Sequence, residues 1–102
     1  MSKQEELYLS IGRSFKKAEQ SQMFGKPCFK INGKAFICFF ENEMVFKING
    51  VPHEEALKLK GSHLFDPSGK NRPMKEWVQV SFENKNKWEH FANAAIKYVS
   101  EI

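Results

Sequence analysis

The stretch Met23–Ile48, MFGKPCFKINGKAFICFFENEMVFKI, decides the fold that the sequence predicts. It contains three short runs with strand character, joined by two turns, Asn32-Gly33 and Glu41-Asn42-Glu43. The middle run, Ala35–Phe40, is apolar at every position, so both of its faces must be covered. We therefore expect the middle run to lie inside a sheet, with other structure packed against the sheet.

Asn32-Gly33 is the strongest hairpin signal in the chain, because both residue types accept a positive φ angle. If these two residues occupy the central positions of the turn, Phe29 faces Phe36 on the neighbouring strand. In that register Cys28 and Cys38 point to opposite faces of the sheet, so no disulfide can join them. A three-residue turn with a bulge would shift this alternation, but we favour the two-residue turn.

Helical patterns surround this region. Residues 3–20 place apolar side chains on one stripe, a short helix opens at Pro52, and a closing helix runs from about Lys85 to Val99. Trp77–Ser81 alternates between apolar and polar residues and predicts a fourth strand. The element order is helix, three strands, helix, strand, helix. The predicted fold class is therefore α+β, an antiparallel sheet packed with helices, in a single domain over residues 1–102.

The composition is that of a globular protein, with 41% hydrophobic and 27% charged residues. No apolar run approaches the roughly 20 residues that cross a bilayer, so we expect no membrane association. The amino terminus is polar and acidic, unlike a signal peptide, and a cytoplasmic location is expected. In that setting the two cysteines are expected to be reduced thiols.

The formal net charge is +4, and the basic excess lies along the strand hairpins and the loop of residues 61–76. Basic side chains that neutralise phosphates give affinity for nucleic acids independent of sequence. Exposed aromatic residues such as Phe24 or Phe65 could add stacking on bases. The candidate nucleic-acid-binding residues are Lys26, Lys30, Lys34, Lys47, Lys70, Arg72 and Lys75. The alternative is that these residues form an ordinary solvated basic surface.

A second hypothesis concerns the apolar residues of the same loop and the strand after it. Phe65, Met74 and Trp77 could border a groove that binds a protein partner or a small ligand, since apolar residues outside regular elements often mark such sites. The alternative is that they fold back onto the core as a lid. The sequence leaves both monomer and homodimer open.

Catalytic and metal-binding patterns are absent from the sequence. The two cysteines and three histidines form no Cys-x-x-Cys or His-x-x-x-His pair, so we expect no metal and no cofactor. Ser68 has no base at a fixed spacing, and we expect a non-enzymatic protein with no catalytic residue. Residues 68–72 could present amide groups to a phosphate. The segment Asp66-Pro67-Ser68-Gly69 is also an ordinary turn sequence, and we favour the turn.

Several short motifs resemble the small proteins of the TfoX/Sxy amino-terminal and YjbR (MmcQ-like) group. The resemblance covers about three quarters of the chain, and the element order agrees with it. The matching positions are Met23, Phe24, Gly25, Gly33, Lys34, Phe36, Lys47, Arg72, Pro73, Met74 and Trp77.

The resemblance implies a compact fold of the double-wing type also seen in frataxin-like CyaY proteins. The TfoX/Sxy proteins regulate natural competence genes and carry a second, helical domain that residues 1–102 do not include. The acidic first helix of frataxins is not reproduced here, so the resemblance implies no iron binding. Residues and resemblance together predict a small binding or accessory protein, either associated with nucleic acid or binding a partner around Phe65 and Trp77.

Overall fold

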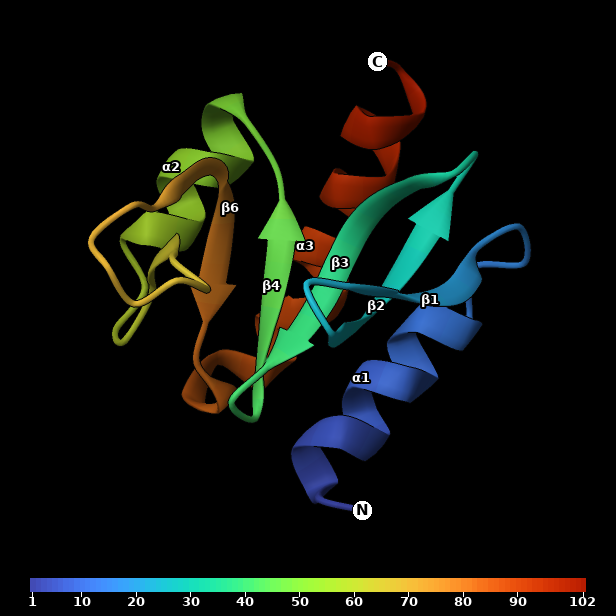
Figure 1. Ribbon diagram of the computed structural model, residues 1–102, viewed down its shortest axis with the longest axis horizontal. Coiled ribbons are helices and arrows are strands. Elements are labelled where there is room, and N and C mark those ends of the chain that lie inside the picture. The colour runs from blue at the N-terminus through green and yellow to red at the C-terminus, as the bar shows by residue number, and fades with distance from the viewer.

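Residues 1–102, all of which the computed structural model describes, form a six-stranded antiparallel sheet packed against three helices (Figure 1). The strands lie in the order β1-β2-β3-β4-β6-β5. The predicted α+β class is confirmed, and the structure adds two strands to the predicted order, β1 and β5. The elements are α1 (Lys3–Arg13), β1 (Glu19–Met23), β2 (Lys26–Ile31), β3 (Lys34–Phe40), β4 (Glu43–Lys47), α2 (Gly50–Leu57), β5 (His63–Phe65), β6 (Met74–Val80), a 3-10 turn (Phe82–Asn84) and α3 (Lys85–Ser100).

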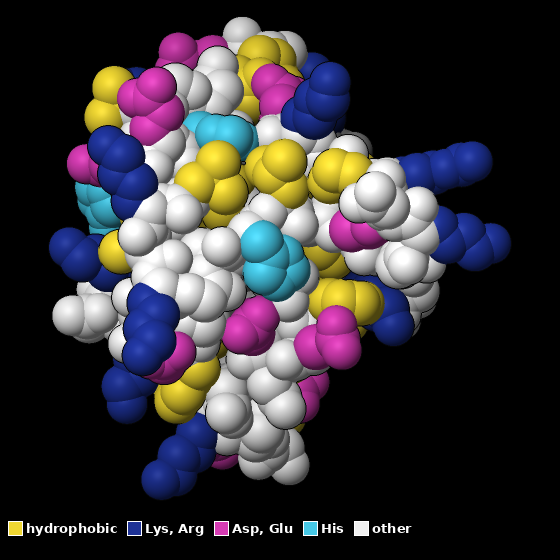
Figure 2. All heavy atoms as spheres, turned by 90° about the vertical axis from the view of Figure 1, so that its left-hand side faces the viewer, with side chains coloured by type: hydrophobic (Ala, Val, Ile, Leu, Met, Phe, Trp, Pro, Cys, Tyr) yellow, Lys and Arg dark blue, Asp and Glu magenta, His cyan; other side chains and the backbone are white.

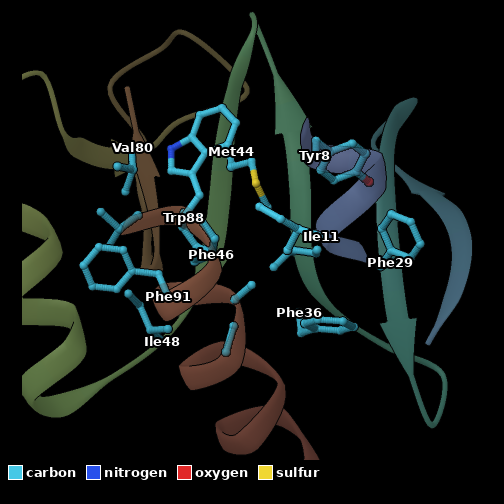
Figure 3. Packing of buried hydrophobic residues seen from close by; sticks show 14 of the residues in the cluster. Tyr8, Ile11, Phe29, Phe36, Met44, Phe46, Ile48, Val80, Trp88 and Phe91 are labelled. Atoms are coloured by element: carbon cyan, nitrogen blue, oxygen red, sulfur yellow. The ribbon is translucent and has the colours of Figure 1, made fainter. Parts of the chain in front are cut away.

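The main core lies between the sheet and the helices. Strand β3 is an interior strand, and its residues 36–39 are buried, as the apolar run predicts. Helix α3 packs across β3 and β4, and its Trp88 and Phe91 side chains are part of the main core (Figure 3). The indole Nε1 of Trp88 donates a hydrogen bond to the Ser81 carbonyl oxygen, so its one polar atom is satisfied inside the core. Helix α1 adds Tyr8, whose ring stacks on Phe39.

The opposite side of the sheet, which we call the helix-free face, carries a second and smaller cluster. Its five buried members are Cys28, Cys38, Val45, Phe65 and Trp77. In Figure 1, α3 lies behind β3 and β4, while the turn between β1 and β2 crosses in front of β3. Half-buried apolar side chains close this cluster where a helix would otherwise do so, namely Met23, Ala35, Phe40 and Met74.

A β-bulge in β3 corrects the predicted register. The two-residue turn at Asn32-Gly33 is confirmed, because both residues have positive φ angles and Ile31 pairs with Lys34. Phe29, however, pairs with Ile37 rather than with Phe36, because the register shifts by one residue between Phe29 and Lys30. The ladder beyond the bulge therefore moves by one position.

This shift places Cys28 directly opposite Cys38, with both side chains in the cluster on the helix-free face. The prediction that the two cysteines point to opposite faces was therefore wrong. Both thiols are free in the structure. The bulge turns Phe36 and Ile37 toward the helices together, and the alternation resumes at Cys38.

Two other predictions about the local structure were wrong. Helix α1 ends at Arg13, where the Ser14 hydroxyl donates a hydrogen bond to the Ile11 carbonyl oxygen, so it does not continue to residue 20. Residues 19–23 instead form an edge strand, β1, that pairs with β2. The loop of residues 61–76 includes the short strand β5 and the start of β6. None of the three helices is both long enough and apolar enough to cross a membrane.

Candidate functional site

Three of the predicted basic residues share the helix-free face. Lys26 and Lys30 flank Cys28 at alternate positions of β2, and Lys47 follows Val45 at the same spacing on β4. Because side chains two residues apart on a strand point to the same side, all three lysines project from the face that no helix covers. All three are half-buried. Lys30 and Lys47 lie on either side of β3, which places their Cα atoms roughly 10 Å apart.

Lys26 also contacts an aromatic ring. Its Nζ atom lies 5.2 Å from the centre of the Phe40 ring, across the β2–β3 ladder. A cation at this distance from a ring is attracted by its negative face. The structure therefore joins a basic and an aromatic group on the helix-free face. This pair depends on the register of the bulged ladder, so no local sequence signal predicts it.

Lys34 is separated from this group. It pairs with Ile31, whose side chain is part of the helix-covered core, and its Nζ donates a hydrogen bond to the carbonyl oxygen of Ile102. The contact holds the Lys34 side chain beside the carboxyl-terminal end of the chain. The structure thus brings together Lys26, Lys30 and Lys47, but it does not bring Lys34 to them.

The loop between β5 and β6 is organised around one carboxylate. Oδ1 of Asp66 accepts hydrogen bonds from the Ser68 amide, the Ser68 hydroxyl and the Gly69 amide, and Oδ2 accepts one from the Arg72 amide. The Ser68 hydroxyl and these amides lower the pKa of Asp66. The turn interpretation is confirmed. The amide groups of Ser68, Gly69 and Arg72, which a phosphate would need, already bind Asp66.

The remaining basic candidates lie on this loop and just after it. Lys70 and Arg72 are exposed on the loop, and Lys75 is exposed near the start of β6. Figure 2 shows the side of the molecule that carries α2, β6 and this loop. Basic side chains project from its margins, and hydrophobic side chains form several small patches between them. This side offers dispersed charge and no large apolar surface.

None of the candidate basic residues is neutralised by a carboxylate. The one close contact between a basic and an acidic side chain in the protein joins His90 Nε2 and Glu55 Oε1 at 3.7 Å, away from the helix-free face. On that face, Glu19 lies opposite Lys30 without forming an ion pair. Glu43 accepts a hydrogen bond of 2.7 Å from the Gln79 side-chain amide, which engages one of its carboxylate oxygens. The ammonium groups of Lys26, Lys30 and Lys47 therefore remain available to an anionic ligand.

The predicted apolar site has little surface to offer. Phe65 is fully buried and Trp77 is 5% exposed, while Met74 is half-buried beside them. The structure therefore agrees with the alternative interpretation, in which these residues fold back onto the core as a lid. The one pocket in the protein, about 320 Å³ in volume, lies between the start of α2 and the last turns of α3. It is lined by Ile48, Asn49, Pro52, Ala94, Lys97, Tyr98 and Glu101.

The nucleophilic groups are shielded. Burial raises the pKa of Cys38 to about 12, and it also raises the pKa of Cys28. A thiol that stays protonated is a poor nucleophile and a poor metal ligand. Nowhere do three His, Cys, Asp or Glu side chains come together in a geometry that could hold a metal ion.

The two aromatic residues that the sequence analysis named as candidates for stacking on bases differ in exposure. Phe65 is buried, whereas Phe24 is 63% exposed at the tip of the β1–β2 hairpin. Every other large hydrophobic residue that is exposed is aliphatic. Phe24 is therefore the one aromatic side chain that lies mostly in solvent.

The fold and this surface define an α+β protein whose sheet has one helix-covered face and one helix-free face bordered by lysines. Comparisons of the chain with protein-family models, with curated proteins and with solved structures gave no match.

Proposed function

We propose that the protein is a non-enzymatic binding protein that associates with nucleic acid through its helix-free face. The observation that carries the proposal is the common orientation of Lys26, Lys30 and Lys47, which project from one face without a carboxylate partner. Each lysine that neutralises a phosphate releases bound counterions, which favours association at low salt. The exposed Lys70, Arg72 and Lys75 would extend the contact along the β5–β6 side.

Two further considerations support the proposal. Asp66 orders the loop from within, so the backbone that carries Lys70 and Arg72 is held in place before any ligand binds. The resemblance to the TfoX/Sxy amino-terminal and YjbR group would also fit a small accessory protein of this kind. The alternative, a partner site at Phe65 and Trp77, has less support because both side chains are buried.

The test is a pair of matched triple variants. Lys26→Gln/Lys30→Gln/Lys47→Gln removes three charges from the helix-free face. Lys3→Gln/Lys87→Gln/Lys97→Gln removes three exposed charges from α1 and α3, on the helix-covered side. Both variants change the net charge equally. Fluorescence anisotropy with labelled oligonucleotides then measures the affinity of each protein as the salt concentration rises from about 50 mM.

We expect the wild-type affinity to fall as salt rises. The first variant should reduce the slope of log K against log salt by about two to three, because three phosphate contacts are lost. The second variant should leave the slope close to wild type. Absence of binding at about 50 mM salt, or an equal loss in both variants, would contradict the proposed function.

A further inference from the structure

The β1–β2 turn breaks a local rule that the next hairpin obeys. Both hairpins have two-residue turns in which both residues have positive φ angles: Phe24 and Gly25 at 54° and 73°, Asn32 and Gly33 at 53° and 78°. Asn-Gly is the preferred pair for such a turn. A bulky residue such as phenylalanine is disfavoured in the left-handed region, because its Cβ approaches the backbone carbonyl oxygen.

The strained residue gains no packing in return. Phe24 is 63% exposed, whereas its neighbour Met23 packs on the cluster of the helix-free face. Residues held in sparsely populated backbone conformations cluster at functional sites, and no packing contact accounts for the conformation of Phe24. An asparagine at this position would form the same turn with less strain.

Phe24 lies next to the cationic group of the candidate site. Lys26 is two residues further along the chain and lies over the ring of Phe40, and the turn crosses the helix-free face (Figure 1). The surface thus combines an exposed ring, a half-buried ring and unpaired lysines. Aromatic rings beside a basic surface bind single strands, because unpaired bases can stack on the rings while phosphates contact the lysines. The bases of a duplex are already stacked inside the helix.

We infer that the protein prefers single-stranded over duplex nucleic acid and that Phe24 is the residue on which a base stacks. This inference rests on the proposed function and adds the substrate class and a specificity-determining residue. The phosphates contact Lys26, Lys30 and Lys47. A base that leaves the strand's own stack lies on the Phe24 ring, and the fixed hairpin turn keeps this ring outside the core.

The experiment compares three probes of equal length and labelling. They are an oligothymidylate of about 15 nucleotides, the corresponding duplex, and an abasic strand that retains the phosphates without the bases. The test variant is Phe24→Asn, which suits the turn and so keeps the hairpin intact. The matched control is Val51→Asn on α2, since Val51 is exposed to the same degree, at 65%. Phe24→Trp retains an aromatic surface.

We expect Phe24→Asn to weaken binding to the oligothymidylate by about tenfold, with little change for the duplex or the abasic strand. Val51→Asn should have no effect, and Phe24→Trp should bind as well as the wild type. If Phe24→Asn changes none of the affinities or changes all three equally, the stacking role is wrong, while a salt-sensitive wild-type affinity would leave the proposed function intact. If the wild-type protein binds no probe, both proposals fail.

Discussion

Cys28 and Cys38 lie directly opposite each other on neighbouring strands, and both side chains are almost completely buried. They are covered by Trp77, Phe65 and half-buried apolar side chains, and no helix contributes to this cover. The burial of the two thiols is thus a direct measure of how well the helix-free face is closed.

We expect both thiols to resist modification in the native protein. A water-soluble disulfide reagent should react slowly in buffer, and it should label both cysteines rapidly once denaturant unfolds the chain. The reason is twofold, since the thiols are inaccessible and their raised pKa keeps them protonated. Rapid labelling of the folded protein would show that the cover over these residues opens readily.

Stability should decline in alkaline solution. Burial raises the pKa of Cys38 from its ordinary value of 9.0 to about 12, so above pH 9 the unfolded chain loses this proton more readily than the folded one. The contribution of Cys38 to stability is fully present below pH 9 and is lost as the pH rises toward 12. Each such group lowers the free energy of unfolding by about 1.4 kcal/mol per pH unit within its window. Cys28 and Tyr8, whose pKa values are also raised by burial, act in the same direction.

Urea unfolding at a series of pH values measures this decline. The double variant Cys28→Ala/Cys38→Ala is the control. It should remove the part of the decline in stability that begins near pH 9. The part of the decline that is due to Tyr8, whose ordinary pKa is 10.0, should remain. A wild-type free energy of unfolding that stays constant between pH 9 and 11 would contradict the burial of these groups.

Position 12 needs a glycine because the Phe29 ring packs directly against it, and not because the helix itself needs one. A Cβ atom at Gly12 would lie 2.1 Å from Phe29 Cε2, far inside contact distance. Alanine is the better helix former by about 1 kcal/mol, but the overlap with a buried ring outweighs that gain. We expect Gly12→Ala to reduce the free energy of unfolding by about 2 kcal/mol. Ser10→Ala, at an exposed position of the same helix, should be neutral or slightly stabilising. A stabilised Gly12→Ala protein would show that α1 packs less closely than described.

Tyr8 carries a buried hydroxyl group without a hydrogen-bond partner. Removing an unsatisfied buried polar group while keeping the ring should stabilise the protein, because the desolvation cost disappears and the ring contacts with Phe29 and Phe39 remain. We expect Tyr8→Phe to raise the free energy of unfolding by about 1 kcal/mol. Chemical denaturation measures the change. A loss of stability instead would mean that the hydroxyl has a bonding partner in solution.

The order of the β5–β6 loop should depend on Asp66. Asp66→Ala removes the acceptor of three amide groups, so nuclear magnetic resonance relaxation should show greater mobility at residues 68–72. Because hydrogen bonds lower the pKa of Asp66, acid should produce the same effect only below the usual range of an aspartate. Ser68→Ala removes the hydroxyl that donates to Asp66 and accepts from the Lys70 amide, and it should have a smaller effect because the three amide contacts to Asp66 remain. Unchanged relaxation in Asp66→Ala would mean that other contacts hold the loop.

The sequence predicts those elements whose pattern is local. The apolar run of β3, the Asn32-Gly33 turn and the amphipathic α3 all follow from it. Strand β1 does not, because Glu19–Met23 is polar and mostly exposed on both faces. It is a strand because it pairs with β2. The apolar Phe15 and Ala18, at helical spacing after α1, reach the core from the connection to β1 and so imitate a longer helix.

The candidate site likewise combines features that a local sequence pattern predicts with features that depend on tertiary contacts. Alternation alone predicts that Lys26 and Lys30 share a face. Whether that face is covered, and which residues of β3 it includes, depends on the bulge, and no residue type in β3 marks a bulge. The pairing of Lys26 with Phe40 and the isolation of Lys34 beside Ile102 are tertiary contacts that no local pattern contains. The exposure of Phe24 likewise depends on the shape of the whole sheet.

The additional residue in β3 also has a consequence for comparing this chain with other sequences. A homologue lacking one residue between positions 34 and 38 would need no bulge, because a regular two-residue hairpin would then bring the positions of Cys28 and Cys38 opposite each other on the same face. An alignment that opens a one-position gap there therefore matches side chains that occupy equivalent space, whereas an alignment without the gap would match residues that point to opposite faces of the sheet.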